Sequence, residues 1–333
     1  MRRLVIGFFA LLLVLTGAYS AYWYIMADRL RDGIAGWAAT AAAQGMEAGW
    51  TGFTLSGFPF AFRARFEAPS IQAEGAATPW SWRSSTLLLE ARPWNLRHIR
   101  FEAPEAQTLH FGLLTDRTRF DIVGSSGVIG LDSRYQAASI DADLGALTAS
   151  DSGKAVLASA AGLDIGLARN DAALDIRLSA RDVEPRMAMD LPVQGAAQID
   201  LTASLLGPLP QQSGEAALAA WRDAGGTLEI RHVLLDWQPI RLEGDGTLAL
   251  DRALQPIGAF SAEIEGHDKL LDGMAQMGLV RPDDARMGQV ALGLLTREGR
   301  QGRPVLKAPV SLQDGFVFLG PLRLARMPRI VWR

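Results

Sequence analysis

An apolar run near the N-terminus constrains this chain more than any other feature of its sequence. From Leu4 to Met26 there are 23 residues and no charged side chain. As a helix this run is about 35 Å long, enough to cross a hydrocarbon core of about 30 Å. Arg2 and Arg3 precede it, and a short positive N-terminus stays on the cytoplasmic side of a membrane. Residues 1–27 are therefore predicted to be a transmembrane anchor, with the rest of the chain exported.

Aromatic side chains gather at the outer end of this run, where rings favour the membrane–water interface. They are Tyr19, Tyr22, Trp23 and Tyr24. A cleaved signal peptide is the alternative, because Ala18 and Ser20 form a small-x-small pattern. The apolar run is longer than the roughly 7–15 residues of a signal-peptide core, and this length favours a retained anchor.

A second helix is expected directly after the anchor, over residues 28–45. Leu30, Ile34, Trp37 and Ala41 recur at helical spacing, and Gly45 is a suitable end. The helix could be a stalk, but we favour packing of the stripe that contains Trp37 on the domain that follows.

From Trp50 onward the apolar period changes to two. Phe60, Phe62, Ala64 and Phe66 alternate with charged residues and are expected to face one way. The same alternation returns at 163–167, 174–178, 199–203, 228–231 and 262–265. Strict alternation is typical of antiparallel strands with one buried and one solvated face. Residues 46–333 are therefore predicted to be one exported β-rich domain.

Helical spacing interrupts the strands at 215–223, 268–279 and 283–296. The expected fold is of the α+β class and β-rich. It has an N-terminal transmembrane helix, then a long, mostly antiparallel sheet with a few covering helices.

Three short motifs resemble those of a known family. They are Trp50–Phe53 with Ser56–Phe60, which contains Gly-Phe-Pro-Phe, then Leu242–Asp251, and Gln313–Pro321. Together with the anchor they resemble the domain-of-unknown-function 2125 family of Gram-negative bacteria, and are distantly similar to the AsmA-like envelope proteins. The AsmA-like resemblance implies an elongated, curved sheet with an apolar inner face and a role in lipid handling between membranes. The family implies no established reaction and no catalytic residues.

Composition excludes several classes of chemistry. The chain has no cysteine, which excludes a disulfide framework, a thiolate nucleophile and cysteine-ligated metal sites. A net charge of −3 gives no general attraction to nucleic acid. No cofactor is expected.

The polar clusters do not match catalytic or metal-binding motifs. His98, Glu102, Glu105 and His110 have no zinc-site spacing, and Pro104 is expected to end the strand between them. Asp141 and Asp143 lack the glycine and glutamate that complete a calcium loop.

Ser152 and Lys154 could act as a nucleophilic pair, but a polar turn between strands is favoured. No metal site and no enzymatic activity are therefore expected.

Four phenylalanines are the candidate lipid-contact residues. They are Phe58, Phe60, Phe62 and Phe66. Gly57 and Pro59 favour a rigid turn that leads an aromatic strand into the core, so packing is the favoured role for these rings and lipid contact the alternative. A basic C-terminal group (Arg323, Arg326, Arg329 and Arg333) could contact acidic lipid or a partner, or could simply be solvated.

These observations predict a single-pass protein of the inner (cytoplasmic) membrane, with its N-terminus in the cytoplasm and its bulk in the periplasm. The expected function is lipid binding or transfer, or envelope maintenance, through the apolar face of the sheet. The alternative is a scaffold with a closed core and no ligand, which binds another envelope protein through the segment from Tyr19 to Trp37. Sequence periodicity alone leaves open whether the apolar face is a groove or a core.

Overall fold

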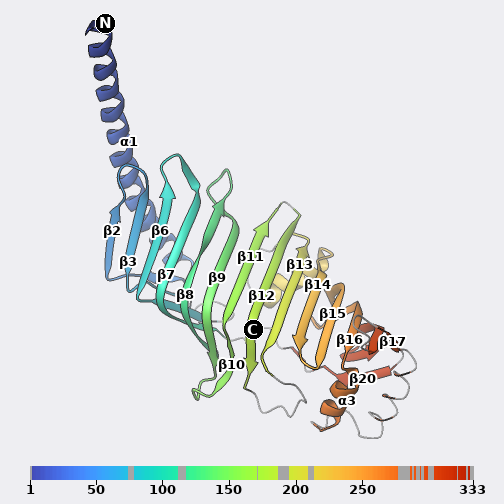
Figure 1. Ribbon diagram of the computed structural model, residues 1–333. Helices are drawn as coiled ribbons and strands as arrows, with labels where there is room; N and C mark the ends of the chain where they lie inside the picture. Colours follow the sequence, from blue (N-terminus) through green and yellow to red (C-terminus); the bar gives the residue numbers. More distant parts are fainter. Residues whose placement is uncertain are drawn as a thin grey trace.

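The N-terminal run and the segment after it form one continuous helix, α1 (Arg2–Ala43), in the computed structural model (Figure 1). No break marks the boundary at residues 27 and 28, and Gly45 follows the helix end with a φ of 80°. The helix is long and apolar enough to cross a membrane. Its first part projects from the sheet, and the large apolar side chains between Leu4 and Leu15 are exposed.

The structure describes residues 2–73, 79–111, 118–170, 172–186, 195–208, 214–276, 296–298, 304–320, 322–327 and 329–330, and the single positions 286, 289 and 293.

Within the described residues, twenty strands form a single sheet in which every pairing is antiparallel (Figure 1). The predicted fold class is therefore confirmed. The strands are β1 (Glu47–Gly49), β2 (Gly52–Ser56), β3 (Phe62–Glu67), β4 (Ser70–Ala73), β5 (Trp80–Ser84), β6 (Thr86–Arg92), β7 (Asn95–Phe111), β8 (Thr118–Leu131), β9 (Ala137–Ser150), β10 (Val156–Ala160), β11 (Gly162–Arg169), β12 (Ala173–Pro185), β13 (Ala197–Leu206), β14 (Thr227–Trp237), β15 (Ile240–Leu250), β16 (Pro256–Glu265), β17 (Thr296–Glu298), β18 (Pro304–Gln313), β19 (Phe316–Leu319) and β20 (Leu322–Arg326).

The sheet bends where its long strands change partners. The first half of β7 pairs with β6 and the second half with β5, and the register shifts between Ala103 and Ala106. Pro104 does not end the strand as expected, because the extra residues of this bulge accommodate it within β7. Ala103, Gln107 and Ser125 are buried at the bend, and the Gln107 amide donates to Ser125 Oγ at 2.8 Å. Ala103 and Ser125 are cross-strand partners on the apolar face.

Beyond the bend the strands follow one another as a simple meander. Strands β11 to β16 each pair with the next strand in the chain, and β18, β19 and β20 continue the order. Such local pairing follows from short connections between antiparallel strands.

The middle of α1 packs against the first strands. The ring of Trp23 stacks on Phe62 with centroids 5.1 Å apart, and Trp23 Nε1 donates to the carbonyl of Ala61 at 3.2 Å. The hydroxyl of Tyr19 donates to the Pro59 carbonyl and that of Tyr22 to the Pro93 carbonyl. These aromatic residues therefore join the helix to two turns of the sheet.

The first aromatic strand differs from the expected pattern at one position. Phe62, Ala64 and Phe66 are buried on one face of β3, as the alternation predicts. Phe60 does not share that face and is 67% exposed. The reason is that residues 57–61 form the turn before β3, with Phe60 N and Ala61 N both donating to the Gly57 carbonyl.

Two of the three predicted internal helices are present as α2 (Glu215–Asp223) and α3 (His267–Gln276). Most of the third, at residues 283–296, lies outside the described residues. Arg286, Gln289 and Gly293 are helical within it.

Replacing Trp23 by alanine is expected to destabilise the packing of α1 on the sheet. Trp23 is 4% exposed, and removing a buried tryptophan side chain costs about 3–5 kcal/mol. Trp37→Ala is the matched control. Trp37 lies on the same helix and, contrary to the expected packing of its stripe, is 50% exposed. Urea unfolding in detergent, followed by circular dichroism, measures both free energies of unfolding. Equal losses in the two variants would contradict the described packing.

Candidate functional site: an apolar face between two packed ends

Strands β9, β11, β12, β13 and β14 align their apolar residues in three rows across the sheet. Each row contains one residue per strand, and neighbours in a row are cross-strand partners. The middle row is Ala142, Ile165, Leu178, Leu201 and Val233. The flanking rows are Ile140, Leu167, Ile176, Ala203 and Ile230 on one side and Leu144, Leu163, Ala180, Ile199 and Leu235 on the other. We call these fifteen positions the apolar rows.

No second layer formed by the described residues covers the apolar rows. Of the fifteen side chains only that of Ala203 is buried, and Ile199 is exposed. In these five strands no leucine, isoleucine or valine is buried. Side chains on the inner faces of two packed sheets would be nearly inaccessible to solvent. This part of the apolar face is therefore an open surface.

Packed clusters close the apolar face at both ends of the sheet. At one end Trp23 and Ala27 of α1 cover Phe62, with Met26, Leu30, Leu55 and Leu96 around them. At the other end the cluster consists of Ala262, Ile264, Leu306, Ala308 and Leu319. The open rows lie between these two clusters, so the described residues form packed clusters on the apolar face at its two ends.

The opposite face of the same strands is polar. Asp141 pairs with Arg177 at 3.0 Å, and Asp143 and Asp164 both lie near Arg181, at 3.4 and 3.6 Å. A hollow of about 540 Å³ on these strands is lined by polar-face residues such as Asp141, Asp164 and Arg177. Four residues of the middle apolar row also line it: Ala142, Ile165, Leu178 and Leu201. The pairs are exposed, and exposed ion pairs contribute little stability. Their main effect is to keep this face soluble.

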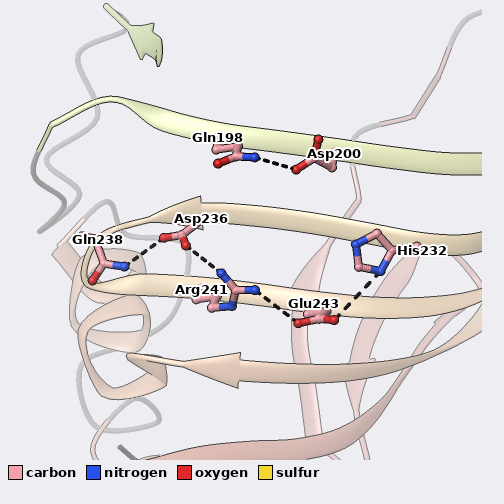
Figure 2. A network of polar contacts seen from close by, with 7 residues as sticks. All are labelled: Gln198, Asp200, His232, Asp236, Gln238, Arg241 and Glu243. Carbon is pink, nitrogen blue, oxygen red and sulfur yellow. Dashed lines mark hydrogen bonds and ion pairs between the residues drawn. The ribbon is translucent and has the colours of Figure 1, made fainter. Parts of the chain in front are cut away.

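Figure 2 shows how the polar face continues onto β14 and β15. Asp236 accepts from Gln238 at 2.9 Å and from Arg241 at 2.7 Å, and Arg241 also donates to Glu243 at 3.4 Å. Glu243 lies 4.0 Å from His232. Partial burial opposes the charge of Arg241, but the two carboxylates outweigh this effect and raise its pKa. The chain of contacts joins β14 to β15.

Asp175 connects three strands of the polar face. Its carboxylate on β12 accepts from Ser204 Oγ on β13 and from Arg231 on β14, the latter at 3.2 Å. The hydrogen bond from Ser204, with the charge of Arg231, lowers the pKa of Asp175.

The four candidate phenylalanines do not form one site. Phe62 and Phe66 are buried in packed regions, with Phe66 in edge contact with Trp50. Phe58 and Phe60 lie in the turn before β3 and are exposed, although the Phe58 ring stacks on Tyr24 at 5.8 Å. None of the four belongs to the apolar rows. The alternation at 163–167, 174–178 and 199–203 was the sequence signal for the open surface.

The polar candidates are separated as well. His98 lies 3.1 Å from the Asn95 side chain, whereas His110 lies 3.5 Å from Ser81, near the other end of β7. Among the described residues, no group of three or more histidine, aspartate or glutamate side chains is placed to hold a metal ion.

Other candidates lie in strands and turns. Asp141 and Asp143 are in β9, and Ser152 and Lys154 are exposed in the turn between β9 and β10. Arg323, Arg326 and Arg329 are exposed, and Arg333 lies outside the described residues.

An apolar N-terminal helix and a long antiparallel sheet with one open apolar face define the structural class of this protein. The chain belongs to the family DUF2125, described as an uncharacterized protein conserved in bacteria, which matches residues 23–328. No curated protein and no solved structure matches the chain. The predicted family resemblance is thus confirmed, while the similarity to AsmA-like proteins stays a prediction.

Asp175→Asn is expected to destabilise the protein at about pH 7 and to have little effect in acid. The pKa of Asp175 is lower in the folded state than its ordinary value of 3.8. The ionised carboxylate therefore stabilises the fold at pH values above 3.8. This contribution is lost as the pH falls through the folded-state value. Urea unfolding of both proteins across this range measures the difference. A difference that stays constant down to the acid end would contradict the role given to the Ser204 and Arg231 contacts.

Proposed function

We propose that the protein is a non-catalytic, membrane-anchored lipid-binding protein of the bacterial envelope. α1 crosses the inner membrane once, and the sheet lies in the periplasm with hydrocarbon chains on its apolar rows. The observation that carries this proposal is the open apolar surface on β9 and β11–β14, which lies between two packed clusters.

The composition of the rows favours a hydrocarbon ligand. All fifteen positions hold alanine, valine, isoleucine or leucine, so the surface offers no hydrogen-bonding side chain. Covering apolar surface yields about 25 cal/mol for each Å² removed from water. Monomeric proteins rarely leave contiguous apolar patches larger than a few hundred Å² uncovered. A ligand that presents only CH₂ and CH₃ groups matches this surface without leaving polar groups unpaired.

The dimensions of the rows also support acyl chains. Five antiparallel strands at about 4.8 Å spacing give rows about 19 Å long. One leaflet of a hydrocarbon core about 30 Å thick is about 15 Å deep, which is the span of one acyl chain in a membrane. Each row is therefore long enough for a single chain laid across the strands.

The charge pattern around α1 supports the proposed orientation. Arg2 and Arg3 precede the apolar run, and positive residues favour the cytoplasmic side. The sheet follows the other end of the helix and would then lie in the periplasm.

Site-specific photo-crosslinking tests lipid binding. A photoreactive amino acid at Leu201 is expected to give adducts with the mass of a membrane lipid. The same group at Thr202 is the matched control, because adjacent strand residues point to opposite faces. Leu178→Asp, directly across from Leu201, is expected to lower the yield of lipid adduct several-fold, since it brings a carboxylate next to the chain.

Equal lipid yields at the two positions, or none at either, would contradict the lipid-binding proposal. A protein adduct at position 201 in place of lipid would also contradict it and would identify the apolar rows as a protein-binding surface.

Single cysteines test the orientation, because the chain has none of its own. Ser152→Cys lies in the exposed turn after β9 and is expected to react with a membrane-impermeant maleimide on intact spheroplasts. Arg3→Cys should react only after permeabilisation. Reaction of position 3 in intact spheroplasts, with position 152 protected, would reverse the proposed topology.

A further inference from the structure

Three hairpin turns lie at the ends of the strands, on the side of the sheet from which α1 projects (Figure 1). They connect β2 to β3, β6 to β7 and β8 to β9. Each presents an aromatic ring to solvent: Phe60 is 67% exposed, Trp94 64% and Tyr135 61%. Large rings at exposed turn positions contribute nothing to the core, so their location needs a different explanation.

The contacts of α1 fix the height of two of these turns along the helix. Tyr19 bonds to the carbonyl of Pro59 in the first turn, and Tyr22 bonds to that of Pro93 in the second. The uncharged run continues beyond both tyrosines to Met26. A helix needs about 20 residues to cross the hydrocarbon core, so a span that starts at Leu4 ends near Trp23. Both turns are thus level with the outer boundary of the membrane.

Basic side chains accompany the exposed rings. The guanidinium group of Arg92 lies 5.7 Å from the centre of the Trp94 ring, and that of Arg97 lies 6.0 Å from the centre of the Tyr135 ring. Arg134 is exposed in the same turn as Tyr135. In the described part of the chain none of the three guanidinium groups lies within 4 Å of a carboxylate, although the charge of Arg134 acts on Asp132 in the same turn. Aromatic rings with neighbouring cations are suited to the headgroup region of a bilayer with acidic lipids.

We infer that these three turns form a second membrane contact, in which Phe60, Trp94 and Tyr135 enter the headgroup region of the leaflet on the side of the domain. Arg92, Arg97 and Arg134 then face acidic lipid headgroups. These three turns and α1 together hold the sheet at a fixed orientation to the bilayer. The inference rests on the membrane anchoring within the proposed function, and it does not depend on lipid binding by the apolar rows.

Two serines at opposite ends of β9 test this contact in the full-length chain. Ser133 is exposed in the turn before β9, beside Tyr135, and Ser152 is exposed in the turn after it. Each is replaced by cysteine, labelled with an environment-sensitive fluorophore, and reconstituted into vesicles of three parts phosphatidylcholine to one part phosphatidylglycerol. Nitroxide-labelled lipid is expected to quench the label at position 133 strongly and the label at position 152 weakly. Trp94→Ser with Tyr135→Ser should move the quenching at position 133 toward the value at position 152.

Flotation of the vesicles separates the two ideas. A chain that floats but whose labels at positions 133 and 152 are quenched equally overturns the second membrane contact and leaves anchoring by α1 intact. A chain that does not float overturns the anchoring on which the contact rests. Loss of lipid adducts at Leu201 bears only on the apolar rows.

Discussion

How much of the apolar face of the sheet is buried is the constraint on which the rest of the structure depends. The chain covers the first strands with α1 and packs the last strands into a second cluster. Between them the side chains of β9 and β11–β14 are aligned by the antiparallel register and left open.

α1 has two parts with different surroundings. Its first turns are exposed and apolar, and its middle is held by Trp23 against Phe62 and by tyrosine hydroxyls against two turns. The helix continues unbroken between these two parts, so there is no hinge at residues 27 and 28. The position of the sheet relative to the exposed apolar part of α1 is therefore set by side-chain contacts.

Most of the fold could be predicted from local patterns, because alternation in segments such as Leu174–Leu178 needs no distant partner. The contacts of α1 with the sheet could not be predicted in this way. Tyr22 binds a carbonyl 71 residues away, and its position in the sequence was equally consistent with a membrane interface. Alternation also placed Phe60 on the wrong side, because it cannot locate the residue at which a strand begins after a turn. Open and closed apolar faces have the same periodicity, so only the structure separates them.

The simple order of β11 to β16 has a consequence for how such a protein can change over evolutionary time. Each strand contacts mainly its two neighbours in the chain, and each adds about 4.8 Å to the sheet. Inserting or deleting one hairpin would lengthen or shorten the apolar surface by two strands and leave the packed ends intact. The reach of the surface can thus be adjusted in discrete steps, much as repeat proteins grow by adding units.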